Sequence, residues 1–203
     1  MCPKTAFVLC VSLCVQAHAA LTINEFHYDN TGSDTGEFIE VVSDGAVGSL
    51  SDVVIHLYNG SNGTVYGFFG LDQFTYDGTL ADGKDYYTYD VTLQNGPDAI
   101  ALVVSGTVVE FLSYEGAFQA TNGPASGMDS VDIGVMEPTS TSVGSSLQRV
   151  SFTDAWQLID GVNTKGQVNT GNPVIPVPGS GLLLLVGLGV VRSKAVHRAL
   201  SVL

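Results

Sequence analysis

The stretch AIALVVSGTVVEFLSYEG, residues 99–116, carries the clearest fold signal in the chain. Residues 99–104 and 107–114 are runs rich in β-branched side chains, and Ser105 and Gly106 join them. A two-residue connection in which glycine can take a positive φ is typical of a tight hairpin. The stretch therefore predicts two antiparallel strands joined by that turn.

The sequence on either side of this hairpin has the same character. Residues 53–58 alternate Val53, Ile55 and Leu57 with their neighbours, a β periodicity. Before residue 174 no segment keeps a helical period, which favours an all-β antiparallel sandwich, with a closed barrel as the alternative. Pairs that favour turns recur at short intervals: Asn59-Gly60, Asn62-Gly63, Asp77-Gly78, Asp82-Gly83, Asn95-Gly96 and Asn122-Gly123.

Residues 117–146 interrupt this pattern, because Gly, Ser, Thr, Pro and Asp replace most large apolar side chains. We interpret them as a long surface loop or a weakly structured excursion. Strand character returns in SLQRVSFTDAWQLID, residues 146–160. Trp156, the only tryptophan, is interpreted as packing at one end of the core.

The N-terminus is typical of a secretory signal peptide. Residues 1–19 contain one lysine, an apolar run over residues 6–15 and the small-residue triplet that ends at Ala19, where we predict cleavage. All three cysteines, Cys2, Cys10 and Cys14, lie inside this segment. The mature chain would therefore contain no disulfide, no cysteine-based zinc site and no cysteine nucleophile.

The C-terminus predicts a membrane anchor. After the domain at residues 20–170 comes a Pro/Gly linker, 171–180, and then an apolar segment with a basic tail, 181–203, expected to form a hydrophobic helix. Its apolar core is shorter than the roughly 20 residues of a comfortable span, although the linker lengthens it. The basic residues that follow fit the positive-inside pattern, and a buried C-terminal helix is the alternative. The residues assigned to sorting and anchoring are Pro176, Pro178, Arg192, Lys194 and Arg198.

The charge of the chain limits its partners. All 20 acidic residues lie between Glu25 and Asp160, where the only basic residues are Lys84 and Arg149, and Lys165 follows shortly after. Such a surface repels phosphate backbones, so no nucleic-acid partner is expected. It suits a soluble domain in a calcium-rich exterior.

Residues 23–40, INEFHYDNTGSDTGEFIE, concentrate acidic side chains around a turn. The alternation of apolar residues slips near Asn24-Glu25, which predicts a β-bulge. An EF-hand is excluded, because Asp34 stands where the loop needs glycine and no helices flank it. A looser calcium site formed by Asp29, Asp34 and Glu37 is the alternative to a solvated acidic turn.

The same stretch could be viewed as an acid–base set made of Glu25, His27 and Asp29. Catalysis also requires a nucleophile or metal and a pocket that excludes water, and no sequence motif indicates either. His27 and His56 are therefore interpreted as edge or surface imidazoles. The sequence predicts a protein that is not an enzyme and needs no cofactor, calcium excepted.

Three stretches resemble, in the same order, parts of the lamin tail domain: INEFHYDNTGSDTGEFIEVV (23–42), NGPDAIALVVSGTVVEFLSYEG (95–116) and SSLQRVSFTDAWQLIDGVNTKGQVN (145–169). The resemblance covers about residues 20–170, and it is to the lamin tail domains of secreted bacterial proteins. It implies an immunoglobulin-like sandwich, a module that often accompanies an extracellular nuclease domain. This chain shows no such domain.

Residues 174–198, VIPVPGSGLLLLVGLGVVRSKAVHR, resemble a bacterial PEP-CTERM sorting signal, which implies processing by an exosortase-type enzyme. They depart from that pattern because no Glu lies between the prolines and the basic tail is longer.

The sequence thus predicts an exported, non-catalytic binding or structural module that is inserted in the membrane, at least transiently, through its C-terminal segment. Its expected location is the cell envelope, the outer surface or the extracellular space. The expected partners are exopolysaccharide or a surface protein. The alternatives are an accessory domain for a separate secreted hydrolase or nuclease, and a weak calcium-binding domain.

Overall fold

A computed structural model describes residues 20–150 and 155–169. The predicted signal peptide with its cleavage site at Ala19, the linker and the apolar C-terminal segment lie outside the described residues. Within that part of the chain there is no helix long and apolar enough to cross a membrane. The only helical elements there are two single 3₁₀ turns, η1 (Leu50–Asp52) and η2 (Leu71–Gln73).

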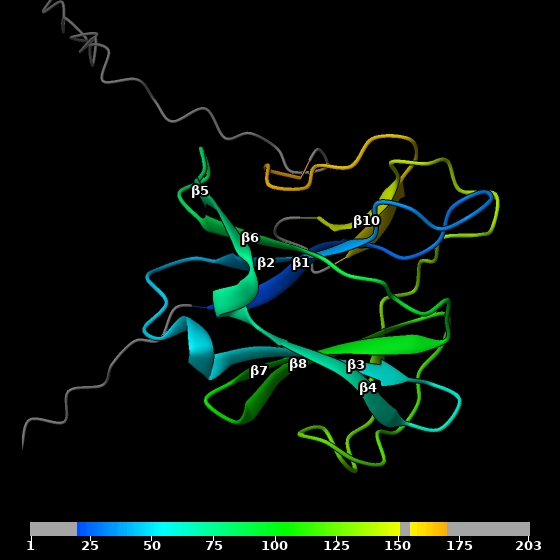
Figure 1. The fold of residues 1–203 in the computed structure, drawn as a ribbon, viewed down its shortest axis with the longest axis horizontal. Coiled ribbons are helices and arrows are strands. Elements are labelled where there is room, and N and C mark those ends of the chain that lie inside the picture. Colours follow the sequence, from blue (N-terminus) through cyan, green and yellow to red (C-terminus); the bar gives the residue numbers. More distant parts are fainter. Residues whose placement is uncertain (1–19, 151–154, 170–203) are drawn as a thin grey trace, which may run out of the picture. The chain divides into compact units, whose positions relative to one another are not determined.

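The described residues form two β-sheets, which Figure 1 shows as separate layers. The first sheet has the order β11-β10-β1-β2-β6-β5 and the second the order β4-β3-β7-β8-β9. The strands are β1 (Leu21–His27), β2 (Phe38–Ser43), β3 (Val53–Asn59), β4 (Thr64–Gly70), β5 (Thr75–Thr79), β6 (Asp85–Asp90), β7 (Asp98–Val104), β8 (Thr107–Tyr114), β9 (Val131–Asp132), β10 (Ser146–Arg149) and β11 (Trp156–Ile159).

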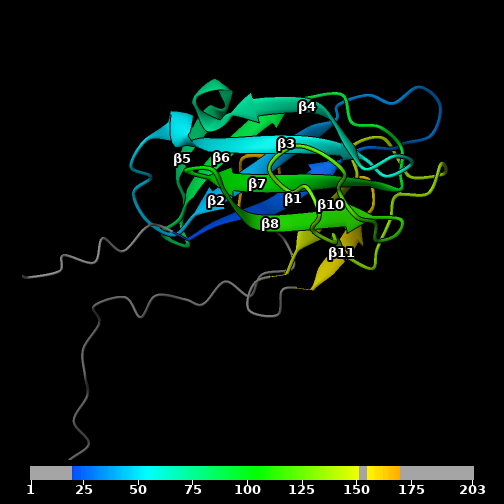
Figure 2. The same cartoon turned by 90° about the horizontal axis from the view of Figure 1, so that it is seen from below.

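This arrangement confirms the all-β, two-layer prediction. Among the described strands none pairs across the two sheets, so the barrel alternative is wrong. One detail differs from the predicted antiparallel pairing, because β8 and β9 run parallel and make the second sheet mixed. Figure 2, turned by 90°, shows β3, β4, β7 and β8 side by side in that sheet.

The hairpin at residues 99–116 forms as predicted. β7 and β8 pair antiparallel from Asp98 with Tyr114 to Val104 with Thr107. Ser105 and Gly106 both take positive φ, 48° and 78°, which gives the turn the handedness that matches the twist of the strands. These strands lie in the interior of their sheet, since β7 also pairs with β3 along its whole length.

The bulge near Asn24 also forms as predicted. The register between β1 and β2 shifts between Ile23 and Glu25. Ile23 before the shift and Phe26 after it both belong to the core between the sheets. Because side chains alternate along a strand, Glu25 and His27 consequently face the opposite side of the sheet.

The core lies between the two sheets and is closed at one end by aromatic side chains. The rings of Tyr28 and Tyr114 stack with centroids 4.2 Å apart. Phe26 packs against Trp156 at 5.4 Å, and the Arg149 guanidinium lies 5.3 Å above the tryptophan ring. Trp156 is therefore a core residue, as its interpretation from the sequence required.

An ion pair also joins the two sheets. Arg149 on β10 contacts Glu110 on β8 at 2.7 Å, with both side chains mostly buried. Glu110 accepts a further hydrogen bond from the backbone N–H of Ile23, and Arg149 donates one to the Ile23 carbonyl. The bulged strand β1 is thereby tied to β10 in its own sheet and to β8 in the other sheet.

The segment at residues 117–146 is largely irregular, but it is packed and not weakly structured. Ala120 and Ala125 are buried against Tyr58 and Phe111 on the outer face of the second sheet. The Tyr58 hydroxyl accepts a hydrogen bond from the Ala125 N–H at 3.0 Å. The small side chains of this segment allow it to approach the sheet closely. They also explain why its composition suggested a loose loop.

Candidate functional site

The outer face of the first sheet carries three carboxylates that are fully buried, Glu25 on β1, Glu40 on β2 and Glu137 in the irregular segment. A buried charge is costly unless it is paired or hydrogen-bonded. The groups that surround these three carboxylates therefore decide whether they form a reactive site or support the fold.

Glu25 and Glu40 lie directly opposite each other on neighbouring strands. Glu25 accepts hydrogen bonds from the Ser146 hydroxyl at 2.6 Å and the Gln148 amide at 3.2 Å. Thr164 adds two more, from its backbone N–H at 2.8 Å and its hydroxyl at 2.6 Å. Every one of these donors comes from the C-terminal third of the described chain.

Glu40 is bonded in the same way. Asn24 donates to it at 2.6 Å and the Gly166 N–H at 2.7 Å. Asn169 completes the network by donating to the carbonyls of Asn24 and Arg149 at 3.1 and 2.9 Å. We call residues 161–169 the closing segment, because the buried carboxylates hold it against the outer face of the sheet.

Burial raises the pKa of both glutamates. For Glu25 the loss of hydration outweighs its hydrogen bonds. For Glu40 burial, together with the charge of Glu25, raises the pKa to about 8. The pair therefore retains a proton near neutral pH, since two adjacent buried carboxylates disfavour a double negative charge.

Glu137 holds the end of β1. It accepts hydrogen bonds from the backbone N–H groups of Tyr28 and Asp29 at 2.7 and 3.0 Å. Its other oxygen lies 2.8 Å from Nδ1 of His27. In return the Tyr28 hydroxyl accepts the Glu137 N–H at 2.8 Å. One side chain from the irregular segment thus satisfies the last residue of β1 and the two residues that follow it.

His27 is fully buried, so its interpretation as an edge or surface imidazole is wrong. Its Nε2 lies 3.2 Å from the Asn30 Oδ1, which already accepts the Thr35 N–H, while the Asn30 amide donates to the Thr31 and Ser33 carbonyls. Both ring nitrogens thus face acceptors, as an imidazolium requires. Burial lowers the pKa of His27, but the hydrogen bond and charge of Glu137 outweigh burial and raise it overall.

The interpretation of His56 as an edge imidazole is wrong, because β3 lies between β4 and β7 in the interior of the second sheet. The His56 side chain is half-buried, so it remains partly at the surface. The ring stacks on Phe68 with centroids 5.8 Å apart. Burial lowers the pKa of His56.

The acidic turn places its three predicted calcium ligands in different environments. Asp29 is buried, Asp34 accepts the Asn30 N–H at 3.3 Å, and Glu37 accepts the Leu93 N–H at 2.5 Å. Burial and the charge of Asp34 raise the pKa of Asp29. No group of three or more His, Cys, Asp or Glu side chains in the described ranges is arranged to hold a metal ion. Calcium binding by this turn stays a prediction.

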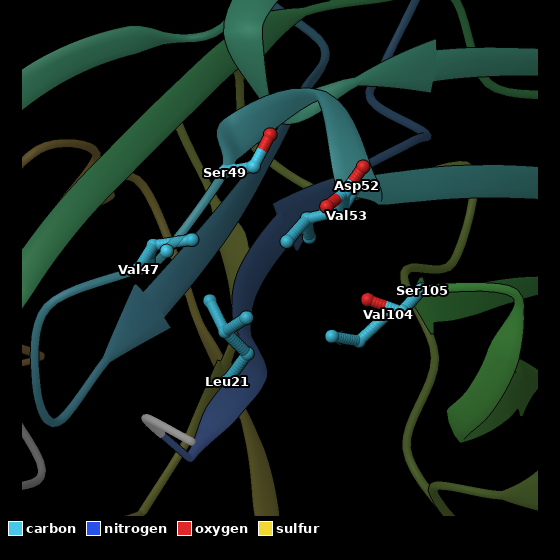
Figure 3. Close-up of a pocket in the computed structure, with 8 residues that line it drawn as sticks. Leu21, Val47, Ser49, Asp52, Val53, Val104 and Ser105 are labelled. Carbon is cyan, nitrogen blue, oxygen red and sulfur yellow. The ribbon is translucent and has the colours of Figure 1, made fainter. Parts of the chain in front are cut away.

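A pocket of about 260 Å³ lies at the start of β1, away from the acidic turn that follows the end of this strand. Leu21, Val47, Val53 and Val104 form its apolar walls, and Asp52 lies on its rim (Figure 3). Ligand pockets usually enclose roughly 300–1,000 Å³ with several convergent polar groups. This pocket is smaller and holds one ionisable side chain, so it does not provide a catalytic set.

Asp98 is a buried carboxylate that the sequence did not single out. One oxygen accepts the Gly60 N–H at 2.9 Å, whereas Oδ2 has no hydrogen-bond partner within the described part of the chain. Burial, with a smaller contribution from the charge of Glu115, raises its pKa to about 6.

The sequence reasoning also missed Glu40 and Glu137 as organising residues. Glu40 has a signal that could have been used, because it stands alone among the apolar residues of FIEVV. Glu137 lies in GVMEPTS, where nothing local distinguishes it from a solvated acid. Its role depends on a contact with residues more than a hundred positions away.

Comparison with known proteins identifies no relative: no family model, no curated protein and no solved structure matches the chain. The lamin tail and PEP-CTERM resemblances accordingly remain predictions.

Proposed function

We propose that this protein is a non-catalytic binding or structural module that is exported, displayed at the cell envelope and held there by its C-terminal apolar segment. In this proposal the two-sheet domain is an immunoglobulin-like sandwich of the lamin tail type. Its partner is exopolysaccharide or another surface protein.

One observation carries the proposal: the buried carboxylates of the first sheet already bind the fold's own donors. Glu25, Glu40 and Glu137 accept hydrogen bonds from the closing segment and from the end of β1. A general acid or base must reach a proton on its substrate, and these oxygens face protein groups instead. Glu25 and His27 of the predicted acid–base set therefore support structure, which favours recognition over catalysis.

The position of the closing segment supports attachment through the C-terminus. Asn169 is hydrogen-bonded to the backbone of β1 and β10 immediately before the predicted linker begins. Force that reaches the domain through a C-terminal anchor would then act on the closing segment, which is hydrogen-bonded to strands inside the first sheet. A peripheral strand would separate more easily under the same load.

The charge of the domain supports the choice of partner. The part of the chain that forms the sheets is strongly acidic, which keeps it soluble and repels anionic polymers. Neutral or cationic polysaccharide and basic protein surfaces remain compatible partners.

Removal of the C-terminal segment tests the attachment. We expect the full-length protein to fractionate with the envelope, and a chain that ends at Asn169 to appear in the medium, because only the former retains the apolar segment. Immunoblots of cytosolic, membrane, periplasmic and medium fractions would measure this. Recovery of the full-length protein in the cytosol with Met1 intact would contradict the proposal.

A further inference from the structure

The backbone of Ala20 is bound to the side chain and backbone of Asp44. The Ala20 N–H donates to the Asp44 carboxylate at 2.6 Å, and the Asp44 N–H donates to the Ala20 carbonyl at 3.1 Å. Ala20 directly precedes β1, and Asp44 directly follows β2, its antiparallel partner. These two bonds form a ring at the end of the strand pair.

We propose that export processing cleaves the Ala19–Ala20 bond and that the new α-ammonium group of Ala20 forms an ion pair with Asp44. The inference rests on the proposed export of the protein. Hydrolysis adds water across the peptide bond, so that Ala19 leaves with a carboxylate and Ala20 gains a protonated amine. The hydrogen bond to Asp44, in which only the carboxylate is charged, then carries a charge on both partners.

The ring fits a chain that begins at Ala20 better than one that begins a residue earlier or later. Cleavage one residue earlier would place the ammonium group beyond Ala19, roughly 3.3–3.6 Å further along an extended chain. Cleavage one residue later would remove the Ala20 carbonyl and leave the Asp44 N–H without its acceptor. Only a chain that begins at Ala20 provides both the charge and the carbonyl.

Asp44 is the acidic side chain that contacts the backbone nitrogen of Ala20 and would therefore pair with the new terminus. Leu21, the next residue, turns into the apolar pocket beside Val47, as Figure 3 shows. Asp52 lies on the rim of the same pocket but, within the described part of the chain, makes no hydrogen bond or ion pair with Ala20, so it offers a control of equal charge at the same end of the domain.

The test uses protein purified after export from the full-length gene, with Asp44→Asn and Asp52→Asn as matched variants. Intact mass determines the first residue, and the pH dependence of amine acetylation at the N-terminal peptide gives the pKa of the α-amino group. Its ordinary value is about 7.7–8.0. We expect a start at Ala20, a raised pKa, and a fall of about half a unit or more in Asp44→Asn but not in Asp52→Asn.

Two results would overturn the inference: a first residue other than Ala20, or equal pKa changes in the two variants. Both can occur in a protein that is exported and anchored as proposed. A protein that retains Met1 in the cytosol would instead remove the proposed function and, with it, the processing event.

Discussion

Glu137→Ala is expected to lower the free energy of unfolding by about 3–5 kcal/mol, the usual effect of removing one partner from a buried ionic contact. The substitution leaves the N–H groups of Tyr28 and Asp29 without an acceptor and His27 without its counter-charge. Each unsatisfied buried group costs about 1–3 kcal/mol, so the sum reaches that range. Chemical denaturation followed by tryptophan fluorescence would measure the loss.

Two variants make this prediction specific. Glu137→Gln keeps an oxygen for the backbone N–H groups and an amide that can donate to a neutral His27, so its loss should be much smaller. Asp129→Ala removes an exposed acidic side chain and should change stability by less than about 0.5 kcal/mol. If Glu137→Ala behaved like Asp129→Ala, the role assigned to Glu137 would be wrong.

Stability is expected to fall as the pH rises from 5 to 8, by on the order of 3 kcal/mol. The pKa of Glu40 is about 8 in the folded protein against an ordinary value of 4.5. The folded state therefore binds the extra proton over this window. A group whose pKa is raised by folding contributes its full stabilisation at a pH below its ordinary pKa. This contribution is lost as the pH rises through the pKa of the folded state. The raised pKa values of Glu25, Asp98 and His27 act in the same direction.

Glu40→Gln isolates the main contribution. The amide cannot ionise, so the difference in unfolding free energy between pH 5 and pH 8 should shrink by more than half. Any constant loss from imperfect hydrogen bonds cancels in that difference. Urea titrations at both pH values provide the measurement, and Asp129→Asn should retain the full dependence. A wild-type stability that is flat or rises over this window would refute the assignment.

Local chemistry predicted the strands and the turn that joins β7 to β8. Ser105 and Gly106 identify the hairpin because a two-residue turn needs positive φ, and the structure has it. The bulge at Asn24 was predictable because the apolar phase breaks there. In both cases the signal and its structural consequence lie within a few residues.

The candidate site was less predictable because its contacts are long-range. Glu25 meets Thr164, which lies 139 positions away, and Tyr28 meets Glu137, 109 positions away. Single-residue patterns therefore assigned His27 to the surface. A solvated histidine and a buried one have the same local sequence, and only the distant carboxylate of Glu137 distinguishes them.

The central claim is that the buried carboxylates fasten the fold and do not form an open reactive site. Hydrogen exchange of the backbone amides that donate to them tests it most directly: Tyr28, Asp29, Thr164 and Gly166. These four amides should exchange far more slowly than Ser33 in the exposed turn. Exchange as fast as that of Ser33 would show that the carboxylates are open to solvent and would contradict the account.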